Sequence, residues 1–166
     1  MSLNLVPDYI FDDIYDITPD FLTSLGVKGV ILDIDNTLVP YENATPTESV
    51  LAWLSALNGV GIKCAIVSNN NKSRVEVFNE QLRLPAYHWS AKPFADSVNR
   101  AICDIGTDKA STVFIGDQIL TDVWAAHNAG IRAMLVSPIK DKTDTLTRFK
   151  RRIEKHFIKK YEKRNK

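Results

Sequence analysis

The stretch Ile31-Leu32-Asp33-Ile34-Asp35-Asn36-Thr37-Leu38-Val39 determines the fold that we expect for this chain. It continues from Val30 as an apolar run, which is typical of a strand buried on both faces of a sheet. Two carboxylates, Asp33 and Asp35, end that run, where ligands bind in an open parallel sheet. Close carboxylates repel each other unless a cation or a shared proton relieves them. The stretch therefore predicts a divalent metal site or a nucleophile beside a protonated carboxyl group, unless the two residues only form a turn.

Apolar runs and helical periodicities alternate along the rest of the chain. Buried strands are predicted at 28–34, 62–67, 86–89, 112–115 and 132–136, and the helices between them at 47–57, 73–82, 93–105 and 121–129. Near the start, Tyr9, Ile10, Ile14 and Ile17 share the spacing of one helical face, and Thr18 with Pro19 is typical of a helix start. The alternation predicts an α/β fold in which right-handed βαβ units build a parallel sheet.

Polar side chains follow four of the predicted strands. They are Asp33 and Asp35, Ser68, Lys92, and Asp117 with Asp122. In a parallel sheet these residues lie on one rim, and together they supply a nucleophile, an acid or base, donors for phosphate oxygens and carboxylates for a metal. The sequence therefore favours phosphoryl transfer as the chemistry of this rim.

The same residues resemble the four motifs of the haloacid dehalogenase (HAD) superfamily of phosphohydrolases. Asp-x-Asp-x-Thr-Leu after a strand is similar to the first motif, Ser68 to the second and Lys92 in Ala91-Lys92-Pro93 to the third. The segment Gly116-Asp117-Gln118-Ile119-Leu120-Thr121-Asp122 is similar to the fourth. The resemblance spans roughly residues 28–136. It implies a HAD-type Rossmann-like fold of three layers, with a parallel sheet of five strands.

The resemblance also implies a role for each matched residue. Asp33 is implied as the nucleophile that forms an aspartyl phosphate, Asp35 as the acid and base, and Lys92 as the cation that neutralises nucleophile and phosphate. The implied phosphate contacts are Thr37, Ser68, Asn69 and Lys92, and the implied metal residues are Asp33, Asp35 through its carbonyl, Asp117 and Asp122. The implied activity is Mg²⁺-dependent hydrolysis of a phosphomonoester.

Substrate class depends on whether a cap covers the site. HAD enzymes with small substrates usually carry an inserted cap domain, but residues 38–46 are too few for one and 69–91 are already occupied by a helix and a strand. We therefore expect one capless domain over residues 1–166, open to a bulky substrate unless another subunit of an oligomer covers it.

The particular residues of the motifs are similar to those of one subgroup, the YqeG-type class IIIA phosphatases of bacteria. The similarity rests on Tyr15-Asp16-Ile17-Thr18-Pro19, Gly29-Val30 and the Asp-Asn-Thr-Leu-Val of the first motif. That subgroup is related to mitochondrial phosphatidylglycerophosphate phosphatases, so the resemblance implies phosphatidylglycerophosphate as substrate. The alternatives are a soluble or macromolecular phosphomonoester, or a HAD scaffold that binds RNA or an assembly through its basic end.

Composition and cysteine usage indicate a cytoplasmic protein. The chain has 166 residues, of which 45% are hydrophobic and 25% charged, and its N-terminus lacks the basic and apolar pattern of a signal peptide. Cys64 and Cys103 are far apart in apolar surroundings, so we expect buried free thiols in a reducing compartment.

The C-terminal segment 143–166 is predicted to be a basic amphipathic helix. Residues 148–166 contain ten Lys or Arg and two acids, a local charge of +8 that leaves −7 for the rest of the chain. Leu146, Phe149, Ile153, Phe157 and Tyr161 are spaced three or four apart. The stripe fits either a helix packed on the sheet or one that meets an anionic membrane or RNA. We expect 148–166 to strengthen association with an anionic surface, peripheral to a membrane if that surface is lipid, and to be dispensable for chemistry.

Overall fold

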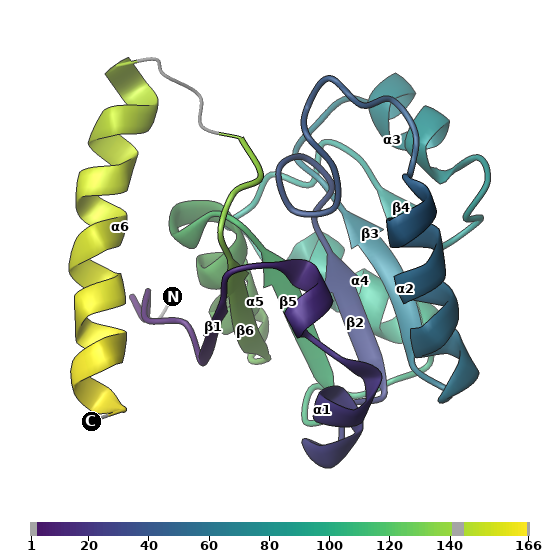
Figure 1. The fold of residues 1–166 in the computed structure, drawn as a ribbon, viewed down its shortest axis with the longest axis horizontal. Coiled ribbons are helices and arrows are strands. Elements are labelled where there is room, and N and C mark those ends of the chain that lie inside the picture. The colour runs from purple at the N-terminus through teal and green to yellow at the C-terminus, as the bar shows by residue number, and fades with distance from the viewer. Residues whose placement is uncertain (1–2, 141–144, 166) are drawn as a thin grey trace.

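Six parallel strands form one sheet in the computed structural model, which describes residues 3–140 and 145–165. The strand order is β1-β6-β5-β2-β3-β4 (Figure 1). The strands are β1 (Tyr9–Phe11), β2 (Gly29–Leu32), β3 (Lys63–Val67), β4 (Ala86–Tyr87), β5 (Thr112–Gly116) and β6 (Arg132–Val136). The α/β prediction is confirmed, and the sheet has one strand more than the five predicted.

The additional strand is β1, where a helical face had been predicted. Tyr9 pairs with Met134 of β6, and a short 3₁₀ turn, η1 (Ile14–Asp16), follows. The helical spacing was misleading because the two pieces are separate elements: Tyr9, Ile14 and Ile17 face the first core, whereas Ile10 faces the second. Three aromatic and β-branched residues suit a short edge strand, but they are too few for a reliable alternation pattern.

Helices cover both faces of the sheet, so the predicted three-layer arrangement is confirmed. They are α1 (Pro19–Ser24), α2 (Glu48–Gly59) and α3 (Lys72–Asn79) on one face, and α4 (Asp96–Asp104), α5 (Trp124–Ala129) and α6 (Thr145–Arg164) on the other. Alternate strand residues serve the two cores: Val30 and Leu32 lie in the first core, and Ile31 lies in the second. None of the helices in the described ranges combines the length and apolar character that a membrane-spanning segment needs.

Local sequence signals explain where the helices near the first motif begin. The Thr18 side chain accepts a hydrogen bond from the backbone N–H of Phe21 and caps α1, whose first residue is Pro19. The Thr47 side chain caps α2 in the same way by accepting from the N–H of Val50. Both caps satisfy backbone donors that the first turn of a helix leaves free.

The C-terminal helix α6 lies along the side of the molecule that carries β1, β6 and α5 (Figure 1). Phe157 and Ile158 pack against the second core, and Arg164 donates to the Pro7 carbonyl at 3.0 Å. The side chains of Leu146 and Phe149 lie outside the described residues. The outward face carries exposed basic residues at Arg152, Lys155, Lys159, Lys160 and Lys163. The helix therefore packs by its apolar stripe and keeps a basic face exposed.

The two cysteines differ in environment. Cys64 is buried, which raises the pKa of its thiol to about 12, but Cys103 is exposed. The prediction of a buried thiol is therefore confirmed for Cys64 and wrong for Cys103. The Cys103 thiol lies on the outward side of α4. The apolar residues around it in sequence face the core instead.

A half-buried Asp8–His127 pair fixes the N-terminal segment to α5 and predicts pH-dependent stability. Asp8 Oδ2 lies 3.0 Å from His127 Nε2, and the Asn4 carbonyl oxygen lies 2.7 Å from His127 Nδ1. Burial and the nearby Arg164 would lower the pKa of His127, but these contacts outweigh them and raise it. For Asp8, burial would raise the pKa, but the hydrogen bonds from His127 and Ala133 lower it.

We expect His127→Gln to destabilise the protein more at pH 5.5 than at pH 8.5. The raised pKa means that the charged His127 stabilises the fold below its ordinary pKa of about 6.5 and stops doing so as pH rises through the folded value. Asp8 is ionised at both pH values. The difference in free energy of unfolding between wild type and variant, measured by urea titration, should be about 0.5–1 kcal/mol larger at pH 5.5 than at pH 8.5. An equal difference at both pH values would contradict this assignment.

Candidate active site

The site forms where two neighbouring central strands end. Leu32 of β2 is paired with Ile115 of β5, and Asp33 and Asp117 follow soon after on the two strands. The strand order reverses at this point, because the chain leaves β2 toward β3 on one side and returns to β5 on the other. Such a switch point opens a crevice at the carboxyl ends of the strands. The fold thus brings together two acids that are 84 residues apart in sequence.

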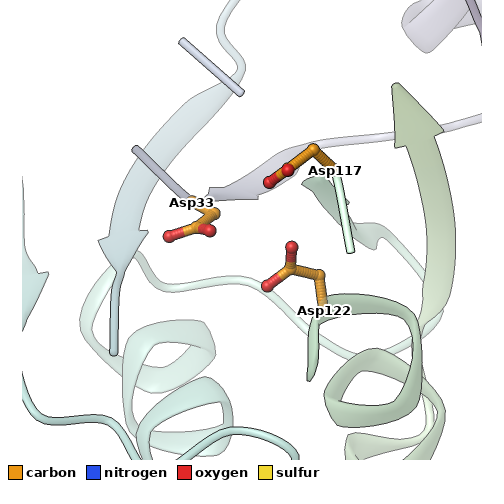
Figure 2. Close-up of side chains that lie close together, drawn as sticks. All are labelled: Asp33, Asp117 and Asp122. Atoms are coloured by element: carbon orange, nitrogen blue, oxygen red, sulfur yellow. The ribbon is translucent and has the colours of Figure 1, made fainter. Parts of the chain in front are cut away.

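Three buried carboxylates point toward one another at this end of the sheet (Figure 2). One oxygen from each of Asp33, Asp117 and Asp122 lies within 4.8 Å of the others. Lys92 Nζ lies 3.1 Å from Asp33 Oδ1 and 2.7 Å from Asp122 Oδ1. The structure therefore brings together four of the predicted site residues, from three of the four motifs.

The cluster contains three acidic side chains and one basic side chain. Burial raises the pKa of Asp33 to about 7, with the Asp122 charge adding to the effect and Lys92 opposing it. Burial and the charges of Asp122 and Asp33 raise the pKa of Asp117 well above its usual range. Burial alone would lower the pKa of Lys92, but the adjacent carboxylates raise it. Three acids face one ammonium here. Their carboxylate oxygens form a ligand set that fits a divalent cation.

The turn after Asp33 places Asn36 in a left-handed conformation. The backbone of Asn36 has φ of 61°, and its N–H donates to the Val39 carbonyl at 2.8 Å. Asparagine tolerates this left-handed conformation better than most residues. The turn brings Thr37 back to the cluster, where its hydroxyl donates to Asp117 Oδ1 at 3.1 Å. Thr37 therefore orients an acid in this structure, and its contact with phosphate stays a prediction.

Asp122 reaches the cluster from a wide helical turn rather than from the regular helix predicted at 121–129. The chain forms a π-helical turn, η2 (Ile119–Val123), which continues into α5. Asp122 Oδ2 accepts from the N–H of Gln118 at 3.0 Å. Turns of this kind are frequent at functional sites because they redirect single side chains.

Gly116 is needed because Asp122 packs directly over it. A Cβ at position 116 would lie 2.4 Å from Asp122 Oδ2 and 2.5 Å from Asp122 Cβ. We expect Gly116→Ala to displace Asp122 from Lys92, to destabilise the fold by about 1–3 kcal/mol and to abolish most of the activity. Thermal unfolding and phosphatase assays measure both effects. Gly59→Ala, at a glycine with nothing within 4 Å, is the control; equal behaviour of the two variants would contradict the clash.

Asp35 does not join the three buried acids, although it was predicted beside Asp33. Its Oδ1 accepts from Arg74 Nη2 at 2.8 Å and from Arg74 Nε at 3.1 Å, and its Oδ2 accepts from Asn70 Nδ2 at 2.9 Å. Arg74 and Asn70 were not predicted as site residues. The signal available was position. Both residues follow β3, the strand adjacent to β2, and Arg74 is one of two basic residues in the first turn of α3.

Ser68 and Asn69 connect the second motif to the third. Ser68 is buried, and its hydroxyl accepts from the N–H of Asn70 at 3.1 Å. The Asn69 side chain accepts from the Lys92 N–H at 2.7 Å and donates to the Lys92 carbonyl at 3.2 Å. Asn69 thus holds the backbone of Lys92 in place. Phosphate contacts from both residues stay predictions.

The loops around the crevice expose large apolar side chains. Tyr41 follows β2 and is 52% exposed, and Trp89 and Phe94 follow β4 and are 67% and 54% exposed. All three lie on loops at the carboxyl ends of the strands. Three exposed aromatic side chains therefore lie at the same end of the sheet as the acids.

Comparisons with known proteins agree with this geometry. A family model described as HAD-hydrolase-like matches residues 90–160. The probable phosphatase YqeG of Bacillus subtilis is 38% identical over 153 residues, which cover 92% of this chain and 89% of that protein.

Solved structures show the same fold at low sequence identity. A putative 3-deoxy-D-manno-octulosonate 8-phosphate phosphatase from Vibrio cholerae has a TM-score of 0.57 at 17% identity, over 77% of this chain and 74% of that one. A cobalt-bound deoxy-D-mannose-octulosonate 8-phosphate phosphatase from Haemophilus influenzae has a TM-score of 0.56 at 15% identity, over 68% and 80%. The motifs, the fold and the similarity to the B. subtilis protein over nearly the full length of both chains lead to one conclusion. This chain is a phosphatase of the YqeG-like family within the HAD superfamily.

Proposed function

We propose that this phosphatase hydrolyses a phosphomonoester through an aspartyl phosphate on Asp33, with Mg²⁺ as its cofactor. The observation that carries the proposal is the buried set of Asp33, Asp117 and Asp122 around Lys92 at the ends of β2 and β5. A structural ion-pair network would pair each acid with a base, whereas this set places three acids beside one ammonium where substrates bind in such sheets.

The proposed chemistry has two steps. An Asp33 carboxylate oxygen attacks phosphorus, the bond from phosphorus to the leaving oxygen breaks, and Asp35 gives that oxygen a proton. Water then attacks the phosphorus of the aspartyl phosphate, Asp35 takes a proton from it, and Asp33 is regenerated as phosphate leaves. Lys92 favours the ionised form of Asp33 and faces the incoming phosphate. Ser68 and the Asn69 N–H supply donors to the phosphate oxygens.

Mg²⁺ would be held by Asp33, Asp117 and the Asp35 carbonyl, with Asp122 as a further ligand or as the partner that orients Lys92. When bound, it neutralises the charge of nucleophile and phosphate. Thr37 fixes one Asp117 oxygen and Gln118 fixes one Asp122 oxygen. The protein thus limits how far each acid can turn.

We expect Arg74→Leu to impair substrates with poor leaving groups most. Arg74 provides two of the three hydrogen bonds that orient Asp35, and an alkoxide needs the proton that Asp35 donates, whereas p-nitrophenolate does not. kcat/KM should fall about 10²-fold for glycerol 3-phosphate and much less for p-nitrophenyl phosphate. Lys72→Leu, on an exposed residue of the same helix, is the control. Equal losses on both substrates would contradict a role through Asp35.

For the substrate, we propose phosphatidylglycerophosphate at the cytoplasmic face of a membrane. The loop between Asn36 and Thr47 and the single helix α3 occupy the two places where a cap would be inserted, so the chain would work as one open domain. The exposed Tyr41, Trp89 and Phe94 suit contact with a bilayer interface, and the basic face of α6 suits anionic lipid. Relationship to the B. subtilis protein supports phosphatase chemistry and leaves the lipid to be tested.

The test is phosphate release by the purified full chain with Mg²⁺ from phosphatidylglycerophosphate in mixed micelles. Glycerol 3-phosphate, which has the reacting group without the acyl chains, is the comparison, and Asp33→Asn is the control for contaminating phosphatase. The proposal predicts a kcat/KM for the lipid that exceeds that of the soluble ester at least tenfold. A preference for the soluble ester would reject the lipid and keep the phosphatase, and the absence of turnover on both would overturn the proposed chemistry.

A further inference from the structure

The turn that carries Asp122 is capped by a residue from the C-terminal helix. This turn, η2, begins at Ile119, and the side chain of the preceding Gln118 makes no capping hydrogen bond. Glu154 of α6 takes that place, because its Oε1 accepts from the Ile119 N–H at 3.2 Å. A helix start leaves its first N–H groups without partners inside the helix, and a side-chain oxygen that accepts from one of them satisfies that donor.

Packing holds Glu154 at this position. Phe157, one turn further along α6, packs with Ile158 against the core cluster that contains Ile119 and Val123 of the capped turn. Arg164 fixes the far end of the helix to the Pro7 carbonyl. The Glu154 side chain is half-buried. The contact between Glu154 and Ile119 is therefore part of a packed interface, whereas the neighbouring lysines of α6 are exposed.

The capped turn is coupled to the acids of the site by short links. Ile119 lies two residues after Asp117 and three before Asp122, and the Gln118 N–H between them donates to Asp122 Oδ2 at 3.0 Å. Asp122 Oδ1 in turn lies 2.7 Å from Lys92 Nζ. Sites of this kind work only within about 0.5 Å of the productive geometry. A shift of the turn by that amount would move Asp117 and Asp122 together.

We propose that Glu154 is a positioning residue for the reaction, which acts through the Ile119 N–H on Asp117 and Asp122 and makes α6 part of the active-site support. This inference rests on the proposed metal site. It replaces the expectation that residues 148–166 are dispensable for chemistry, because their deletion would remove the cap together with the basic face. It also separates two roles of α6: the inward Glu154 supports the acids, and the outward basic residues remain available to an anionic surface.

The test compares three substitutions at Glu154 in the full chain. Glu154→Gln keeps an acceptor of the same length, Glu154→Asp keeps the charge without the reach, and Glu154→Leu removes the acceptor. Glu162→Leu, at an exposed acid of the same helix, is the matched control. Three quantities are measured: Mg²⁺ affinity by calorimetry without substrate, amide hydrogen exchange of residues 118–122, and kcat with KM at saturating and limiting Mg²⁺.

We expect Glu154→Leu to weaken Mg²⁺ binding about tenfold, the lower end for lost outer-shell partners. The amides of 118–122 should exchange faster, and kcat should fall with little change in KM. Glu154→Asp should show the same changes in part, and Glu154→Gln and Glu162→Leu should behave as wild type. Should Glu154→Leu not fold, the comparison of Glu154→Asp with Glu154→Gln decides in the same way.

Two outcomes distinguish failure of this inference from failure of the proposed function. Wild-type-like Mg²⁺ affinity and amide exchange in folded Glu154→Leu and Glu154→Asp would overturn the positioning role and leave the metal site intact. The absence of Mg²⁺ binding by the wild-type chain would overturn the metal site itself. A fall in melting temperature without changes in affinity, exchange or kcat would show that Glu154 only stabilises the packing of α6, which also overturns the proposal.

Discussion

Asp33→Asn should eliminate turnover, with a loss in kcat on the order of 10⁴-fold or more, and leave the fold intact. An amide oxygen cannot form the aspartyl phosphate. The neutral side chain also avoids the cost of burying a charge and the repulsion from Asp122, which together raise the pKa of Asp33 to about 7. Lys92 keeps its contact with Asp122 at 2.7 Å. The melting temperature without metal should therefore stay within a few degrees of the wild type or rise.

The measurement is a steady-state assay with p-nitrophenyl phosphate and Mg²⁺, together with thermal unfolding of the same preparations. Asp20→Asn, at an exposed acid on α1, is the control for purification and should be fully active. Activity of Asp33→Asn within tenfold of wild type would contradict its assignment as the nucleophile.

Asp117→Asn should have the second largest effect, through loss of the metal. Asp117 is buried, is held by Thr37 and lies within 4.8 Å of the other two acids. Removing its charge removes part of the attraction that offsets dehydration of Mg²⁺. We expect kcat/KM to fall at least about 100-fold, and EDTA to stop the wild-type enzyme reversibly.

Thermal unfolding gives a second measurement for Asp117 that does not depend on turnover. Excess Mg²⁺ should raise the melting temperature of the wild type, because a ligand that binds only the folded state stabilises it. The same addition should change that of Asp117→Asn little. Full wild-type activity in EDTA, or an equal shift in both proteins, would contradict the metal site.

The parts of the fold that sequence could predict are those with local signals. The buried strand that ends in Asp33, the capping threonines Thr18 and Thr47, and the polar strand ends each depend on a few neighbouring residues. The placement of Asp33, Lys92 and Asp117 on one rim follows from topology, because parallel strands have their carboxyl ends on the same side. The approach of Asp122 also needs the turn η2.

The parts that sequence could not predict depend on tertiary contacts. Strand β1 has three residues, and its pairing partner β6 lies more than a hundred residues away. Arg74 and Asp35 meet because the first turn of α3 and the turn after β2 lie at the same end of the sheet, and no charge pattern in sequence pairs them. Glu154 is one of two acids in a basic segment, and nothing in the sequence relates it to Ile119, from whose N–H it accepts a hydrogen bond.

Detection of phosphate on Asp33 tests the central claim most directly. In Asp35→Asn the base for the second step is absent, whereas p-nitrophenyl phosphate still allows the first. After mixing with this substrate and Mg²⁺, acid quenching and peptide mass spectrometry should find one phosphoryl group on Asp33, with a burst of about one p-nitrophenol per active site. p-Nitrophenol release with Asp33 unmodified, or phosphate on another residue, would contradict catalysis through an Asp33 aspartyl phosphate.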